Sequence, residues 1–199
     1  MIFDVTKIAE KDLQCLFQYV HEEKCKNFLT KTKEHYRLLN AFSDMFHDEI
    51  LMDIGTFKGL SALSLALNHQ NKVITVNKEK RSNFLGKPIE DGFPIEVVTE
   101  NILSVRDNEE LADNIKKSAV VLLDITHNGK DEQDFYEFLL EIEYKGILIA
   151  DDIYLKRNGD MEGWWNSIKE KKFDLTEYGH WSGTGIVDFS NKLEIKWTT

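Results

Sequence analysis

Three aspartates follow directly after two short apolar runs in the second half of the chain. Asp124 comes after residues 119–123, and Asp151 and Asp152 come after residues 147–150. If both runs are parallel strands, their carboxyl ends meet at one edge of a sheet, so the three carboxylates converge there. Converging carboxylates repel one another unless a cation or a base lies among them, and oxygen ligands suit Mg²⁺ or Ca²⁺. We therefore predict a divalent-metal site; the alternative is that these acids only cap loops and helix ends.

A histidine lies three residues after the first of these aspartates. His127 can take a proton from a hydroxyl group, because an imidazole with a pKa of about 6.5 is mostly neutral at pH 7. We expect Asp124 and His127 to act in catalysis, with His180 as a second candidate acid or base. The remaining histidines have no paired spacing that suggests zinc, and we expect each of them at the surface: His21, His35, His47 and His69.

The apolar run 50–54 leads into a turn that contains two glycines, Gly55 and Gly59. A glycine lets the backbone turn sharply and approach a ligand, and a helix that starts after such a turn presents free N–H groups. Phe57 stands where a dinucleotide-binding G-x-G-x-x-G pattern has a glycine, and the lysine of a P-loop is missing before Ser61. The turn therefore favours another ligand, or it is a glycine turn that binds none.

The spacing D-x-G-x-x-x-G of this turn resembles the first motif of class I S-adenosylmethionine (SAM) methyltransferases. The resemblance implies that the methionine end of SAM is held by the turn and the helix start, at Asp53, Gly55, Thr56, Gly59 and Ser61. It implies that the ribose and adenine are flanked by residues after the second and third strands, at Asn77, Glu100 and Asn101. The family has an acid where this chain has Asn77, a difference that Glu79 could compensate. Turn chemistry explains the two asparagines equally well.

The strand-end aspartates extend the resemblance. Asp124, Asp151 and Asp152 are placed like the metal ligands of the Mg²⁺-dependent O-methyltransferases typified by catechol O-methyltransferase, which use Asp, Asp and Asn. Asp152 in place of Asn matches the metal-dependent sugar O-methyltransferases related to macrocin O-methyltransferase. His127 falls where the catechol enzymes carry a lysine base. The resemblance implies a SAM-dependent O-methyltransferase that is assisted by Mg²⁺ and acts on a small hydroxylic acceptor, a sugar or a vicinal diol.

Other functions stay open at this point. The first alternative is a metal-independent methyltransferase that acts on nitrogen or oxygen of a small molecule. The second is a degenerate methyltransferase fold that only binds, since the ribose acid is missing at Asn77. A nicotinamide-dependent oxidoreductase is a weaker third alternative, because Phe57 replaces a glycine of the dinucleotide-binding pattern.

The elements that must position these residues alternate along the chain. Short apolar runs and amphipathic stretches alternate from residue 50 on, which predicts an α/β fold with a Rossmann-like, doubly wound and mostly parallel sheet. The strands are expected at 50–54, 73–76, 95–98, 119–123 and 147–150, and the helices at 60–67, 108–115, 134–142 and 161–171. Residues 173–178 and 186–189 are expected to form a C-terminal antiparallel hairpin. We expect one domain over 1–199, with a helical cap at 1–48 on a core at 49–199.

Composition limits the kinds of partner. The 199 residues contain 25 Lys and Arg against 35 Asp and Glu, a net charge of −10, which disfavours nucleic acid as a partner. Cys15 and Cys25 lie ten residues apart in a segment predicted to be helical. Ten helical residues are too long for a disulfide to span, so free thiols are expected. The acidic N-terminus is unlike a signal peptide, and no apolar run could cross a bilayer. We expect a cytoplasmic protein that acts on a small-molecule acceptor and has no membrane partner. A homodimer is compatible with these expectations. At least two of the three tryptophans Trp164, Trp165 and Trp181 are expected to pack in the core.

Overall fold

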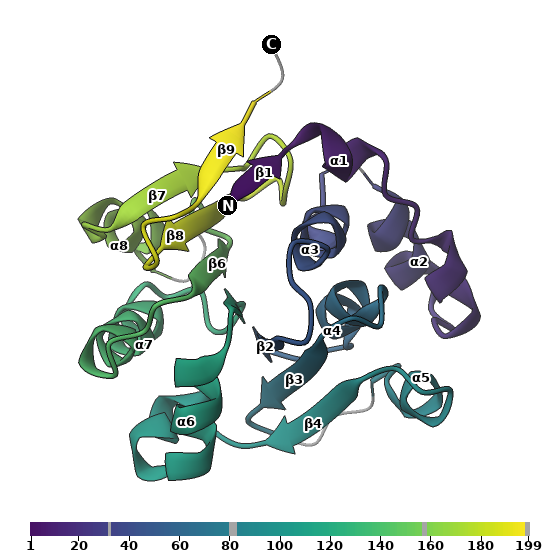
Figure 1. Ribbon diagram of the computed structural model, residues 1–199, viewed down its shortest axis with the longest axis horizontal. Coiled ribbons are helices and arrows are strands. Elements are labelled where there is room, and N and C mark those ends of the chain that lie inside the picture. Colours follow the sequence, from purple (N-terminus) through teal and green to yellow (C-terminus); the bar gives the residue numbers. More distant parts are fainter. Residues whose placement is uncertain (32, 80–82, 157–158, 198–199) are drawn as a thin grey trace.

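The computed structural model describes residues 1–31, 33–79, 83–156 and 159–197. Its centre is a seven-stranded sheet in the order β4-β3-β2-β5-β6-β8-β7 (Figure 1). The strands from β4 to β6 are parallel neighbours, whereas β8 is antiparallel to both β6 and β7. The strands are β2 (Ile50–Ile54), β3 (Lys72–Asn77), β4 (Ile95–Thr99), β5 (Val120–Leu123), β6 (Ile147–Asp151), β7 (Lys171–Asp174) and β8 (Thr184–Asp188). The predicted mostly parallel α/β sheet with a C-terminal antiparallel pair is confirmed.

Helices cover both faces of this sheet, and this explains why the central strands are apolar throughout. Successive residues of one strand enter different cores: Leu51 packs with the N-terminal helices, and Met52 packs with the helices of the opposite face. One face carries α3 (Tyr36–Ser43), α4 (Leu60–Ala66) and α5 (Gly86–Glu90), and the other carries α6 (Glu109–Lys117), α7 (Lys130–Glu141) and α8 (Met161–Ser167) (Figure 1). A short η2 (Ile102–Asp107) precedes α6.

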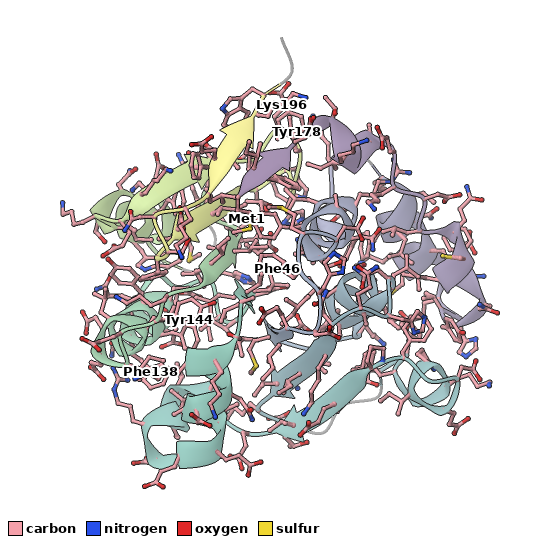
Figure 2. The ribbon with its side chains drawn as sticks, viewed as in Figure 1. Met1, Phe46, Phe138, Tyr144, Tyr178 and Lys196 are labelled. Atoms are coloured by element: carbon pink, nitrogen blue, oxygen red, sulfur yellow. The ribbon has the colours of Figure 1, made fainter. Side chains whose placement is uncertain are left out.

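The N-terminal segment is more varied than a helical cap. It contains β1 (Ile2–Asp4), α1 (Thr6–Ala9), the 3-10 helix η1 (Gln14–Gln18) and α2 (Glu23–Thr30) before α3. Strand β1 was not predicted, and it pairs in parallel with β9 (Glu194–Lys196) at the other end of the chain. The Lys196 ammonium lies 2.6 Å from the Asp4 carboxylate, and Figure 2 shows Met1 and Lys196 in the same region of the molecule. A three-residue strand has no periodicity of its own, so only its distant partner reveals it.

The C-terminal segment differs from the prediction in its boundaries. The helix expected to reach residue 171 ends at Ser167, because Ile168 has extended backbone angles. Strand β8 lies between β6 and β7, so β7 is the outer strand of the sheet. Trp164 and Trp165 are buried and Trp181 is 64% exposed, so the expectation that at least two of these tryptophans pack in the core is confirmed.

The two cysteines do not share one helix. Cys15 lies in η1 and is exposed, Cys25 lies in α2 and is buried, and both are free thiols as expected. In the described part of the chain, no helix is long and apolar enough to cross a membrane.

The packing of the N-terminal segment on the core can be tested at Phe42. Its side chain is fully buried, with its ring centroid 4.9 Å from that of Phe3. We expect Phe42→Ala to lower the free energy of unfolding by about 3–5 kcal/mol, because it leaves a cavity between β1 and α3. Urea denaturation measures this loss. Leu140→Ala, at a position 44% exposed on α7, is the matched control and should change stability by less than about 0.5 kcal/mol. Equal effects of the two changes would contradict the described packing.

Candidate functional site

The glycine turn follows β2 and crosses the end of β5. Gly55 has a φ of +116°, and a Cβ atom at this position would stand 1.7 Å from the backbone oxygen of Asp124. Gly59 has a φ of +85°, and its Cβ would stand 2.6 Å from the side chain of Leu85. Both glycines are therefore required by the protein's own packing. The turn is thereby pressed against Asp124.

Asp53 lies beneath this turn and is fully buried. Its Oδ2 accepts a hydrogen bond of 2.6 Å from the Thr75 hydroxyl, which lies 2.7 Å from the hydroxyl of Thr56. The Oδ1 atom of Asp53 has no hydrogen-bond partner among the described residues. Burial raises the pKa of this carboxyl to about 7. Asp53 and Thr56 thus support the turn from inside.

A cavity of about 510 Å³ opens beside the turn, at the carboxyl ends of β2, β3 and β5. Its volume falls within the range of small-molecule sites. Apolar side chains of Ile54, Val76 and Ile102 contribute to its walls. Six residues proposed from sequence also line it: Gly55, Asn77, Glu100, Asn101, Asp124 and His127.

The other residues predicted to bind a cofactor lie outside this cavity. Thr56 and Ser61 line a smaller adjacent cavity of about 40 Å³. The asparagines of the large cavity also bond to the backbone: Asn77 donates to the Glu79 oxygen at 2.6 Å, and Asn101 accepts from the Leu103 N–H at 3.3 Å. These local hydrogen bonds to the backbone therefore explain in part why asparagine occurs at the two positions.

The three strand-end aspartates lie around two imidazole rings. His127 Nε2 is 2.9 Å from an Asp124 oxygen and 3.6 Å from an Asp152 oxygen. His180 Nδ1 is 2.7 Å from the other Asp152 oxygen and 3.5 Å from an Asp151 oxygen. The structure thus brings together all three predicted metal ligands and both candidate bases at one edge of the sheet.

A third histidine joins this cluster, which corrects the expectation for His35. Instead of lying at the surface, His35 is only 3% exposed, and its Nδ1 lies 3.0 Å from Asp151 Oδ1. It directly precedes α3, and the Oε2 atom of the adjacent Glu34 lies 3.5 Å from His180 Nε2. No local signal identifies His35, because its partner is 116 residues away. The other three histidines are exposed as predicted: His21, His47 and His69.

The pKa values in the cluster reflect this pairing. Burial disfavours the charged imidazole of His127, but the hydrogen bond to Asp124 and the charges of Asp124, Asp152 and Asp151 together outweigh burial and raise the pKa to about 9. The ring is therefore protonated at pH 7, which corrects the expectation of a mostly neutral imidazole. Burial is likewise outweighed at His180, where Asp151 and Asp152 raise the pKa to about 10. Burial opposes ionisation of Asp151, yet His35 and His180 hold its pKa well below the usual range. Imidazolium groups therefore balance much of the negative charge near neutral pH.

Glu132 holds the loop that carries His127, and the sequence interpretation did not include it. Its carboxylate is buried and accepts hydrogen bonds of 2.7 Å from the backbone N–H groups of His127 and Gly129. His127 needs this support because its φ is +56°, a left-handed conformation unusual for a residue with a side chain; Asp152, at +58°, shares it. A glutamate three residues into a helix is a capping signal, which could have identified Glu132.

The donor atoms in the cluster are suitable for a divalent cation. Asp124, His127 and Asp151 each offer one ligand atom within 4.8 Å of the others. This group differs from the predicted set of Asp124, Asp151 and Asp152, because His127 takes the place of Asp152 and supplies a nitrogen donor. The carboxylates fit a cation, and the imidazoles widen the range of ions that could bind.

We expect Gly55→Ala to destabilise the chain by about 2–4 kcal/mol, because the new Cβ meets the Asp124 carbonyl in a conformation that L-residues avoid. Urea denaturation measures the change. Gly86→Ala is the control, since a Cβ there has no neighbour within 4 Å, and it should stay within about 0.5 kcal/mol of the parent. A Gly55→Ala protein as stable as Gly86→Ala would show that the turn is not tightly packed.

Asp53 makes stability depend on pH. Its pKa is about 7 in the folded chain against 3.8 ordinarily, so the folded state binds a proton that the unfolded state releases. This contribution is fully present below about pH 4 and is lost as the pH rises through about 7. We expect the loss of unfolding free energy between pH 5 and pH 8 to be smaller in Asp53→Asn than in the parent. Urea denaturation at both pH values provides the comparison, and identical losses would contradict the buried, uncharged state of Asp53.

No protein-family model matches the sequence, and no curated protein matches it. Solved structures do match. The O-methyltransferase TomG from Streptomyces achromogenes, in complex with SAM, has 13% identity and a TM-score of 0.61 over 94% of this chain and 96% of TomG. The SAH-bound methyltransferase PaMTH1 from Podospora anserina has 10% identity and a TM-score of 0.58, over 92% of this chain and 87% of PaMTH1.

A third structure is the TDP-rhamnose 3'-O-methyltransferase CalS11 of calicheamicin biosynthesis. It has 10% identity and a TM-score of 0.57, over 92% of this chain and 91% of CalS11. These likenesses extend over nearly the whole length of both partners, and at such identities they establish the fold. The chain therefore has the Rossmann-like fold of the class I SAM-dependent methyltransferases.

Proposed function

We propose that this protein is a SAM-dependent O-methyltransferase that acts on a small hydroxylic acceptor, a sugar or a vicinal diol. One observation carries the proposal. Asp124 and His127 line the 510 Å³ cavity and also belong to the cluster of aspartates and histidines. A methyl donor in the cavity would therefore lie next to groups that can bind and deprotonate a hydroxyl.

We assign the two ends of the cofactor to different residues of the cavity and the turn. Gly55 and the turn would hold the methionine part, whereas Asn77, Glu100 and Asn101 would flank the ribose and adenine. Asp53, Thr56, Gly59 and Ser61 would act by shaping and supporting the turn. Asn77 is neutral, so its hydrogen bonds to ribose hydroxyls would be weaker than those of a carboxylate.

Methyl transfer breaks the sulfur–methyl bond of SAM and forms an oxygen–methyl bond, so the hydroxyl must lose its proton. His127 is favoured over His180 as the acceptor of this proton, because His127 lines the cavity. Its ring must first be neutral, which its pKa of about 9 permits only at alkaline pH. A cation bound beside Asp124 would lower this pKa and make the neutral ring available at lower pH. Asp124 would orient its ring through the 2.9 Å contact at Nε2. Asp124, Asp151 and Asp152 would hold a divalent cation such as Mg²⁺. The cation would lower the pKa of a hydroxyl of the acceptor.

An exposed aromatic side chain beside the cluster supports a sugar acceptor. Trp181 is 64% exposed and lies beside His180, with 5.6 Å between the ring centroids, so it offers a flat apolar surface for a sugar ring. A sugar acceptor is also named for CalS11, which shares the fold.

A second candidate function is that of a non-catalytic protein that has lost SAM and binds another molecule. The amide of Asn77 in place of a carboxylate favours it, because the ribose acid is missing. Calorimetry with S-adenosylhomocysteine separates the two. One binding site per chain supports the enzyme, whereas no binding at millimolar ligand would exclude it.

Turnover tests the proposed chemistry. We expect the purified chain to convert SAM with members of a panel of sugars and diols, and Asp124→Asn to lower kcat/KM about 100-fold or more, because it removes a proposed metal ligand and His127's partner. Mass spectrometry of the methylated product measures this. The control is Asp113→Asn, at an exposed carboxylate paired with Lys117 on α6, which should keep the parent rate. Full turnover in the presence of EDTA would instead identify a metal-independent methyltransferase.

A further inference from the structure

A second donor set shares Asp151 with the first. It consists of His35, Asp151 and His180, which come from the segment before α3, the end of β6 and the loop before β8. We propose that these three residues bind a divalent transition-metal ion that accepts imidazole ligands, such as Zn²⁺. Two nitrogens and one carboxylate oxygen would be the protein ligands.

The distances suit one ion. His35 Nδ1 is 3.0 Å from Asp151 Oδ1, and His180 Nδ1 is 3.5 Å from Asp151 Oδ2. The three ligand atoms lie within 4.8 Å of one another. Two ligands of one zinc ion are about 3.3 Å apart when each bond is about 2.0–2.1 Å and the geometry is tetrahedral. Side-chain movements of about 1 Å would therefore complete the coordination.

The surroundings hold the ligands in place. His35 is 3% and Asp151 is 4% exposed, so neither side chain moves freely in solvent. His180 turns Nδ1 toward the strand-end carboxylates, 2.7 Å from Asp152 and 3.5 Å from Asp151, and its other nitrogen, Nε2, faces the Glu34 carboxylate at 3.5 Å. A carboxylate on the second nitrogen is the usual support of a metal-binding histidine, because it fixes the orientation of the ring. Thr184 Oγ1, 3.5 Å from Asp151 Oδ1, adds a further contact.

The donor types select the ion. Mg²⁺ prefers oxygen ligands and retains water, whereas imidazole nitrogen suits Zn²⁺, Fe²⁺, Co²⁺ and Ni²⁺. Three protein ligands leave a coordination position open, as in catalytic zinc sites. A role for this ion in activating the acceptor rests on the proposed function, but the binding of the ion does not. Asp151 belongs to this set and to the three-carboxylate set.

Cobalt provides a direct probe of this site. The purified chain of residues 1–199, freed of metal with EDTA and dialysed, is titrated with Co²⁺ while visible absorption is recorded. We expect one equivalent to bind with the strong visible bands of low-coordinate Co²⁺. One equivalent of Zn²⁺ should abolish these bands, and a hundredfold excess of Mg²⁺ should leave them unchanged. Displacement of Co²⁺ by that excess of Mg²⁺ would overturn the inference without any variant.

Two variants assign the ligands. We expect His35→Gln and His180→Gln each to weaken Co²⁺ binding about tenfold or more. His47→Gln, which removes an exposed histidine, is the matched control and should bind like the parent. Thermal melts check that each variant is folded. Parent-like Co²⁺ affinity in His35→Gln would overturn the inference.

Calorimetry with S-adenosylhomocysteine on the same samples keeps the two proposals distinguishable. Co²⁺ binding without cofactor binding would support this site and contradict the proposed function. Cofactor binding without tight Co²⁺ binding would contradict only this site.

Discussion

The close approach of the Gly55 backbone to the carbonyl of Asp124 is the contact on which the site depends. Strands β2 and β5 are neighbours in the sheet, and the turn after β2 crosses the end of β5 with no space for a Cβ atom. The hydrogen bond from the Asp124 N–H to the Ile54 oxygen, 2.9 Å long, ties the same two strand ends together. One backbone contact thus places the proposed cofactor turn against the first aspartate of the cluster. This contact fixes the distance between the turn and Asp124.

The second constraint is the cost of burying carboxylates. Asp151 and Asp152 are nearly inaccessible to solvent, and such groups need partners that balance their charge. The partners come from segments outside the central strands: His35 from the N-terminal segment and His180 from the loop before β8. The N-terminal segment therefore does more than cover the sheet. It completes the polar cluster, because without His35 one buried carboxylate would lose its closest imidazole.

Local sequence patterns were sufficient to predict the sheet but not the full site. The apolar runs marked β2 to β6 within one or two residues, and the aspartates at their ends were brought together because parallel strands end at one edge. His35 could not be found in this way, since its contact with Asp151 spans 116 residues and has no local period. Strand β1 was not predicted for the same reason, because its pairing with β9 depends on the tertiary structure. Glu132 differs from both, because its position at the start of α7 follows a local capping rule.

The pairing of β1 with β9 bears on the order in which the chain can fold during synthesis. Asp4 and Lys196 are 192 residues apart, so this parallel pair can form only after nearly all described residues have left the ribosome. The segment between β1 and α3 carries His35, and it gains its anchor to the C-terminal strand last. Long-range pairs of this kind form slowly, because a large loop must close first. A nascent chain would therefore assemble its parallel core before the polar cluster is closed, and incomplete chains would lack the β1–β9 anchor of the segment that carries His35.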